Sequence, residues 1–178
     1  MFSLPLQTER LLLRTFLQRD LEFFHSYRSD PVLARYQGWT PMSEEKCREF
    51  IREQTHSLEN FGQDGHWTQI AIVRKDTKEL IGDIGLCSLS TNKGLVTIGF
   101  TLAQKHQGRG FAIEAIQHLL CHLFSQTCYH SVKAITDQRN ISSIRLLKRL
   151  GFQHTKTQHT VFKDEPCEEE TYYLIHTP

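Results

Sequence analysis

The chain has 178 residues, of which 39% are hydrophobic and 23% charged, and this balance excludes the disordered and fibrous classes of protein. Its 21 basic and 20 acidic residues nearly cancel, so a nucleic-acid partner, which requires lysine and arginine to neutralise phosphates, is not expected. No stretch approaches the roughly 20 apolar residues that cross a membrane, and residues 1–5 lack the pattern of a signal peptide. We expect one domain, residues 1–178, with no membrane partner.

The cysteines are odd in number, scattered and without a CxxC pair, which predicts reduced thiols and a cytoplasmic location. His118 and His122 stand four positions apart with Cys121 between them, a spacing that zinc sites can use. No third and fourth ligand is evident in the sequence. We therefore expect no metal cofactor.

The first third of the chain predicts one strand and two helices. Residues 11–16 form a short apolar run suited to a strand. Apolar side chains spaced near 3.6 residues from Leu21 onward predict a helix that ends before Asp30-Pro31. Ser43 is placed to cap a second helix, whose apolar face runs as far as Leu58.

The middle of the chain predicts three consecutive strands. They cover residues 66–74, 80–89 and 95–102, with polar turns at 75–78 and 90–94 between them. Because each turn is short, neighbouring strands must run in opposite directions. This part of the sheet is therefore expected to be antiparallel.

The last part of the chain alternates between strands and helices. The expected helices cover residues 112–124 and 141–150, and the expected strands cover 132–136, 152–162 and 171–176. The order β-α-β-α-β-β predicts an α/β protein with a mixed sheet and helices on its faces. The acidic run Glu168-Glu169-Glu170 is expected in a solvated loop, or alternatively as a feature that attracts a cationic amine.

The turn before the helix at 112–124 carries the most specific chemistry. Two glycines in a strand-to-helix turn let backbone N–H groups converge, and a helix N-terminus attracts anions, so the turn fits a diphosphate. Arg109 adds a permanent cation, and Lys105 and His106 stand next to it. The alternative is a glycine turn that only caps the helix. Neither a P-loop nor a complete GxGxxG fingerprint is present. The turn consists of Gln107, Gly108, Arg109, Gly110, Phe111 and Ala112.

This turn resembles the Q/R-x-x-G-x-G/A signature of the GNAT superfamily of N-acetyltransferases, and the resemblance covers nearly the whole chain. Four further segments resemble the RimJ/RimL-like branch, which includes the ribosomal-protein N-acetyltransferases, and they occur in its order. They are Thr8 to Arg14 ("TERL-x-LR"), Ile81 to Leu86 ("IG-x-IGL"), Ile98 to Phe100 ("IGY") and Asn140 to Phe152 ("N-x-x-S-x-x-LL-x-x-LGF").

The resemblance implies the GNAT fold, an α/β (α+β) architecture. Its mixed, mostly antiparallel central sheet is splayed between the fourth and fifth strands, with helices on both faces. It also implies acetyl-CoA as co-substrate. The main chain at Phe100 and Leu102 would hold the pantetheine arm and polarise the thioester carbonyl. The turn at 107–112 would bind the diphosphate, and Asn140 would bond the arm through its side-chain amide.

The implied reaction is the direct attack of a primary amine on the acetyl thioester, which needs a base for the ammonium and can use an acid for the departing thiolate. The tyrosine that many relatives use as acid is Leu147 here, and Ser143 matches the serine of RimJ/RimL-like enzymes. Ser143 could instead cap a helix, and the thiolate could leave without an acid. The usual acidic residue of the fourth strand is Thr97 here, which leaves the base unknown. The remaining candidates are Asp83, Glu114, His66 and His154, with a structural role expected for Glu114 and a solvated strand position as the alternative for Asp83.

The acceptor is a small-molecule amine or a protein N-terminus, a choice that the sequence leaves open. Trp39 is expected to line the acceptor site, with a packed aromatic as the alternative. Dimers are common among members of the family that this chain resembles, and for this chain a monomer and a homodimer both stay open. The rival interpretation is a non-catalytic acyl-CoA-binding or regulatory module, because no base is evident.

Overall fold

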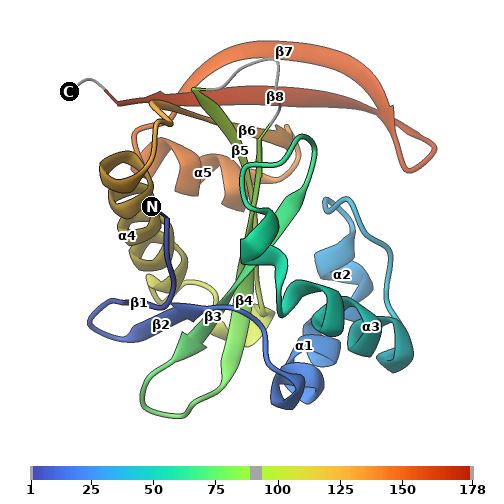
Figure 1. The fold of residues 1–178 in the computed structure, drawn as a ribbon. Helices are drawn as coiled ribbons and strands as arrows, with labels where there is room; N and C mark the ends of the chain where they lie inside the picture. Colours follow the sequence, from blue (N-terminus) through green and yellow to red (C-terminus); the bar gives the residue numbers. More distant parts are fainter. Residues whose placement is uncertain (1, 89–93, 177–178) are drawn as a thin grey trace.

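The computed structural model describes residues 2–88 and 94–176, and Figure 1 shows the chain as a ribbon. The expected turn at 90–94 lies almost wholly outside the described residues. The strands are β1 (Leu6–Gln7), β2 (Leu11–Arg14), β3 (Trp67–Arg74), β4 (Leu80–Ser88), β5 (Leu95–Leu102), β6 (Ser131–Asp137), β7 (Gln153–Phe162) and β8 (Glu165–Ile175). The α-helices are α1 (Leu21–Arg28), α2 (Pro31–Ala34), α3 (Glu44–Gln54), α4 (Phe111–Gln126) and α5 (Ile141–Arg149).

The strands form one sheet in the order β1-β2-β3-β4-β5-β6-β8-β7. Only the β5–β6 pair is parallel; the other described neighbours are antiparallel. The sheet is therefore mixed and mostly antiparallel, as the sequence predicts.

The parallel pair separates partway along its length. β5 and β6 are paired from Leu95 opposite Ser131 to Ile98 opposite Ala134, and the pairing ends there although both strands continue. The second halves of β5 and β6 therefore diverge, which is the predicted splay between the fourth and fifth of the expected strands. The short strand β1, which the sequence pattern did not predict, shifts the numbering by one.

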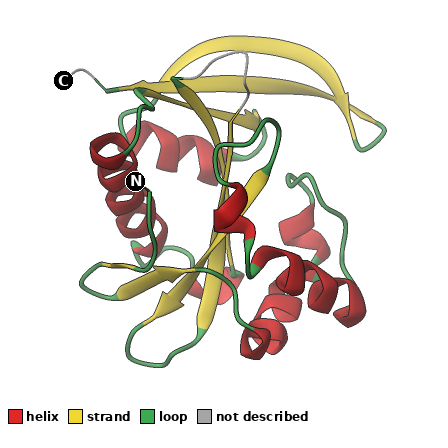
Figure 2. Cartoon of the chain, in the orientation of Figure 1, coloured by secondary structure: helices red, strands yellow, loops and turns green. Residues whose placement is uncertain are grey.

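Helices cover both faces of the sheet (Figure 2). One apolar core places α4 side chains such as Ile116 and Leu119 against β-strand residues such as Ile84 and Val132. The other packs Phe24 of α1 and Ile51 of α3 against the opposite side, with Phe24 and Phe50 stacked 5.1 Å apart. Two cores on two faces hold the sheet between them, so the fork between β5 and β6 is a fixed feature of the scaffold.

The cap predicted at the start of the helix after Ser43 is present in the structure. The Ser43 side chain accepts a hydrogen bond from the Lys46 N–H and caps α3. Asp30 likewise accepts a hydrogen bond from the Val32 N–H and caps α2, a one-turn helix beginning at Pro31 that the sequence analysis did not predict.

The C-terminal hairpin differs from the prediction. β8 begins at Glu165 instead of residue 171, so Glu168-Glu169-Glu170 lies in a strand and the solvated-loop interpretation is wrong. The three glutamates are only partly exposed, because β8 is paired on both sides, with β6 and with β7. In Figure 1 the β7–β8 hairpin arches over the sheet, and its tip reaches toward α2.

Candidate active site

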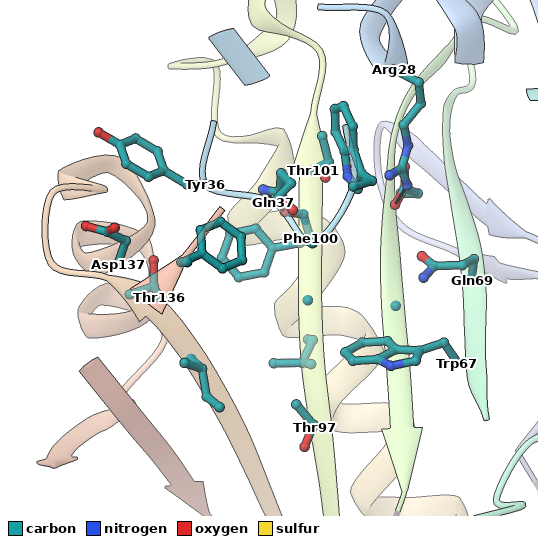
Figure 3. A pocket seen from close by; sticks show the side chains of 18 of the residues that line it. Arg28, Tyr36, Gln37, Trp67, Gln69, Thr97, Phe100, Thr101, Thr136 and Asp137 are labelled. Carbon is teal, nitrogen blue, oxygen red and sulfur yellow. Dashed lines mark hydrogen bonds and ion pairs between the residues drawn. The ribbon is translucent and has the colours of Figure 1, made fainter. Parts of the chain in front are cut away.

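A cavity of about 610 Å³ lies where β5 and β6 diverge. Its floor comes from β3, β4 and β5, and its walls come from β6, α1, α3, the loop at 36–39 and the β7–β8 hairpin. Figure 3 labels side chains from α1, the 36–39 loop, β3, β5 and β6 around it. Six of the lining residues are aromatic and come from five segments: the 36–39 loop, α3, β3, β5 and β7. They are Tyr36, Trp39, Phe50, Trp67, Phe100 and Phe162.

The backbone of β5 offers hydrogen-bonding groups to this fork. The Ala103 N–H donates to the Ile81 carbonyl at 2.8 Å, so residue 103 faces β4. Peptide groups alternate in direction along an antiparallel strand, which turns those of Phe100 and Leu102 away from β4 and toward β6. Both residues lie beyond Ile98, the last β5 residue paired with β6. Their N–H and C=O groups therefore face the open fork.

Two side-chain amides occupy the carbonyls at this edge. Gln37 Nε2 donates to the Phe100 carbonyl at 3.4 Å, and Gln107 Nε2 donates to the Leu102 carbonyl at 2.9 Å. Gln37 belongs to the loop that lines the cavity, whereas Gln107 begins the glycine turn. The two bonds link the open edge of β5 to both of its neighbouring loops.

Glycines in β4 and β5 make the floor flat. A Cβ at Gly85 would lie 2.9 Å from Trp67 Cε3, and a Cβ at Gly99 would lie 3.6 Å from Trp67 Cζ3. The Trp67 ring therefore rests on the backbone of two strands. The glycines of the "IG-x-IGL" and "IGY" segments leave the space that this ring occupies.

A buried ion pair closes one end of the cavity. Arg28 Nη2 lies 2.9 Å from Asp83 Oδ1, and the Tyr27 hydroxyl donates to Asp83 Oδ2 at 2.6 Å. Arg28 also lies over the Trp39 ring, with Cζ 4.6 Å from the ring centre. Burial by itself would lower the pKa of Arg28, but the charges and hydrogen bonds of Asp83 and Tyr27 together outweigh it, and the pKa is raised. Burial, and after it the charge of Asp83, raises the pKa of Tyr27 well above its usual value.

Two other carboxylates line the cavity. The Arg139 guanidinium hydrogen-bonds Asp137 at 2.7 Å and holds the pKa of that carboxyl below its usual range. Within the described residues, no cation lies in ion-pair distance of Glu169. Cys167 and Glu169 are two positions apart on β8 and line the cavity from the same face of the strand. Glu169 is thus the unpaired carboxylate of the cavity among the residues that the structure describes.

The glycine turn lies outside this cavity, beyond the end of β5. Gly108 and Gly110 have φ angles of +73° and +81°, which glycine adopts without strain, and Gly110 is the N-cap of α4. Lys105 and the buried His106 both contact Glu79, so neither points to the turn as a free cation. No acidic side chain of the described chain pairs with Arg109, which leaves its charge at the turn.

The comparisons with known proteins agree with this geometry. A model of the acetyltransferase (GNAT) domain matches residues 10–153. The uncharacterized N-acetyltransferase YoaA of Bacillus subtilis (strain 168) is 32% identical over 175 residues, which cover 96% of each chain. The uncharacterized N-acetyltransferase p20 of Bacillus licheniformis is 32% identical over 149 residues, covering 83% of this chain and 82% of the relative. The chain belongs to the GNAT acetyltransferase family.

Solved structures share the fold at lower identity. A GNAT-family acetyltransferase from Bacillus anthracis superposes with a TM-score of 0.86 at 22% identity, over 97% of this chain and 98% of that one. RimL, the ribosomal L7/L12 alpha-N-protein acetyltransferase in complex with coenzyme A, gives a TM-score of 0.82 at 16% identity, over 95% and 96%. The GNAT fold expected from the sequence is therefore confirmed, and RimL is among the structures that share it.

Within this GNAT fold, Asn140 and Ser143 lie together at the start of α5. Asn140 Oδ1 accepts the Ser143 N–H at 3.2 Å and caps the helix, which engages the amide oxygen and leaves the amide nitrogen for another acceptor. Neither residue lines the cavity described above. Both follow β6, one of the two strands that form the fork.

The four candidates for the base lie in different surroundings. Asp83 is 2% exposed and paired with Arg28, so the solvated-strand interpretation is wrong, and its carboxylate is already engaged. Glu114 accepts hydrogen bonds from Thr8 and Arg10. Burial alone would raise the pKa of Glu114, but these bonds hold it below its usual range. His66 and the exposed His154 do not line the cavity.

Sequence reasoning missed the cavity residues Arg28 and Trp67, and it considered Glu169 only as part of an acidic run that could attract a cationic amine. Arg28 stands at the end of an amphipathic helix, where its burial has no local signal. Glu169 is flanked by Glu168 and Glu170, and no apolar alternation along residues 165–170 singles it out.

In residues 2–88 and 94–176, no group of three or more His, Cys, Asp or Glu side chains is arranged to hold a metal ion. No helix in the same residues is long and apolar enough to span a membrane.

Proposed function

We propose that the protein transfers an acetyl group from acetyl-CoA to a primary amine, and that residues 1–178 constitute one acetyltransferase domain for this reaction. The observation that carries the proposal is the fork: the peptide groups of Phe100 and Leu102 face an unpaired edge next to a cavity and a glycine turn. An extended pantetheine arm can hydrogen-bond to such an edge as an added strand does.

The proposed placement of the coenzyme uses three segments. The arm lies along Phe100 and Leu102, where it displaces the Gln37 amide from the Phe100 carbonyl. The side-chain nitrogen of Asn140 bonds the arm from the β6 side. The diphosphate lies on the turn formed by Gln107, Gly108, Arg109, Gly110, Phe111 and Ala112, where the N–H groups at the start of α4 and the Arg109 cation stabilise it.

In the reaction, the amine nitrogen attacks the thioester carbonyl and forms a C–N bond, and a backbone N–H at the fork stabilises the oxyanion of the tetrahedral intermediate. The C–S bond then breaks, the nitrogen of the intermediate loses its second proton, and the thiolate takes up a proton, so that an amide and the thiol of coenzyme A are formed. We propose Glu169 as the base that takes the proton of the ammonium, because it is the cavity carboxylate without a cationic partner among the described residues. Ser143 is the proposed proton donor to the thiolate. Replacing it with alanine should lower kcat and leave the Kd of coenzyme A unchanged.

The acceptor is proposed to be a primary amine of a small molecule or of a protein N-terminus, which enters the cavity between the 36–39 loop and the β7–β8 hairpin. Trp39 and Trp67 would contact its apolar part. The overlap with RimL concerns the fold alone and does not choose between these two acceptors.

The test is a thiol-release assay with acetyl-CoA and a panel of amines that includes amino acids, polyamines and short peptides. The account expects turnover with at least one amine and a Kd for coenzyme A measurable by calorimetry. Tight binding of coenzyme A without turnover on any amine would favour a non-catalytic acyl-CoA-binding module instead. No binding at all would overturn the proposal.

A further inference from the structure

The Thr8-Glu9-Arg10-Leu11 segment has no role in the function proposed so far. It joins β1 to β2 and lies against the N-terminal turn of α4, more than ninety positions further along the chain. Lys75 fixes the segment from the other side: its N–H donates to the Arg10 carbonyl at 2.9 Å and its Nζ to the Thr8 carbonyl at 3.0 Å. The segment is thus held between β3 and α4.

Glu114 of α4 determines how Arg10 is oriented. The carboxylate accepts the Thr8 hydroxyl, the Arg10 N–H at 2.9 Å and Arg10 Nε at 2.6 Å. The Arg10 guanidinium also covers the Phe111 ring, with Cζ 4.5 Å from the ring centre. A side chain held at Nε and stacked on a ring has few rotamers left, although 44% of it is exposed.

From this position Arg10 reaches the glycine turn. Its Nη1 donates to the Arg109 carbonyl at 3.0 Å, and a Cβ on Gly110 would lie 3.3 Å from its Nη2. In the described part of the chain, no backbone–backbone hydrogen bond reaches Gly108 or Arg109; such bonds border the turn only at Gln107 and Gly110. Arg10 is therefore the contact that fixes the middle of a turn with two left-handed glycines.

The charge of Arg10 does not explain this arrangement. The carboxylate of Glu114 pairs with the guanidinium, so the pair adds little net charge for an anion, and the unpaired cation of the turn is Arg109. Arg10 instead restricts the conformations that the turn can adopt. A glycine-rich turn loses much conformational freedom when its N–H groups converge on a phosphate, and a carbonyl fixed in advance reduces that loss.

We propose that Arg10 is a positioning residue for the coenzyme diphosphate, and that it acts through the Arg109 carbonyl to hold the 107–110 turn in its anion-binding shape. This inference rests on the proposed function, since it presumes that coenzyme A binds at the turn. It gives the first segment of the chain a part in coenzyme binding that the cavity alone does not show.

The test compares three ligands by calorimetry in the wild type and in Arg10→Gln. Coenzyme A and dephospho-coenzyme A contain the diphosphate, and pantetheine ends before it. We expect Arg10→Gln to lower the affinity for both diphosphate ligands about tenfold, the effect of losing one hydrogen bond from a charged group. Its affinity for pantetheine should fall less than about twofold. Arg10→Lys should rescue little, because an ammonium cannot reach Glu114 and the Arg109 carbonyl in one planar fork.

The matched control is Arg48→Gln, which removes another exposed arginine–glutamate pair, 2.7 Å long, on α3. It should leave the affinity for all three ligands unchanged. If Arg10→Gln weakened the binding of pantetheine as much as that of coenzyme A, the role of Arg10 would be merely structural and the inference would be overturned. An unchanged affinity for coenzyme A would overturn it as well. A loss confined to coenzyme A would overturn it too, by assigning Arg10 to the 3′-phosphate. A wild type that binds no coenzyme A would overturn the proposed function itself.

Discussion

Several glycines in this protein stand where a side chain would strain the backbone or meet a neighbouring group. Gly110 caps α4 with a φ of +81°, and a side chain there would point toward Arg10. Gly85 and Gly99 provide room for the Trp67 ring. Gly110 is needed for its positive φ and Gly85 for the close approach of the ring, whereas a Cβ at Gly99 would make only ordinary contact with it. Each of the three lies in a segment that resembles the family.

Gly110→Asp should abolish the binding of coenzyme A while the fold is kept. The added carboxylate would repel the diphosphate at the start of α4, where an anion is otherwise stabilised. Gly65→Asp is the control, because Gly65 has a φ of +69° and a Cβ there would have nothing within 4 Å, so the substitution imposes a similar backbone strain elsewhere. Calorimetry should detect binding in the control only; an unchanged affinity in Gly110→Asp would contradict the placement of the phosphates.

Glu169→Gln should reduce kcat/KM at neutral pH by about a hundredfold or more, the usual contribution of a general base, with the Kd of coenzyme A unchanged. Glu168→Gln is its control, since Glu168 pairs with His159 instead of lining the cavity. Steady-state kinetics of the two variants against the same amine would decide the matter. Equal activity of Glu169→Gln and the wild type would exclude Glu169 as the base.

Among the elements, the β7–β8 hairpin connects the C-terminal part of the chain to the acceptor side. Lys163 at its tip donates to the carbonyls of Ala34 and Trp39, both at 2.6 Å, and burial lowers the pKa of Lys163. The tip therefore holds the loop that carries Tyr36, Gln37 and Trp39. This contact joins two walls of the cavity that are more than 120 positions apart in the sequence.

Lys163→Met should raise the KM for the amine by about fivefold, because a loop released from two charged hydrogen bonds orders the acceptor less well. The Kd of coenzyme A should stay the same, since the glycine turn lies elsewhere. Lys156→Met on the same hairpin, which loses only a contact with Gln158, serves for comparison. A KM that stays at the wild-type value in Lys163→Met would show that the hairpin does not shape the acceptor site.

Much of this element structure could be predicted from local patterns. The strands at β3, β4 and β5, the cap at Ser43 and the amphipathic α4 all depend on short-range periodicity and turn chemistry. β8 could not be predicted in full, because residues 165–170 show no apolar alternation and become a strand only through pairing with β6 and β7. The sequence also placed Trp39 at the acceptor site, but it could not show that Arg28, Trp67 and Glu169 line the same cavity, because these residues meet only in the folded chain.

For the molecule as a whole, three largely buried carboxylates link stability to pH. Hydrogen bonds and ion pairs lower the folded-state pKa of Glu79, Glu114 and Asp137 below their ordinary values of 4.5 and 3.8. A carboxyl with a depressed folded pKa contributes stability that is present above its unfolded pKa and lost as the pH falls through the folded value.

We therefore expect the urea midpoint to be nearly constant from pH 7 to pH 5 and to fall steadily below about pH 4.5. The urea midpoint of Glu114→Gln should be lower than that of the wild type at pH 7 and should fall less on acidification. Equilibrium unfolding at several pH values measures both quantities. A midpoint that rises on acidification, or an identical slope in the variant, would show that these contacts do not govern acid stability.

The most direct measurement of the central claim is a crystal structure of the protein with coenzyme A bound. The account predicts an extended pantetheine arm between β5 and β6, hydrogen-bonded to the peptide groups of Phe100 and Leu102, with Gln37 displaced and the diphosphate on the turn at 107–112. A complex with the coenzyme bound elsewhere, or with the diphosphate away from that turn, would contradict it.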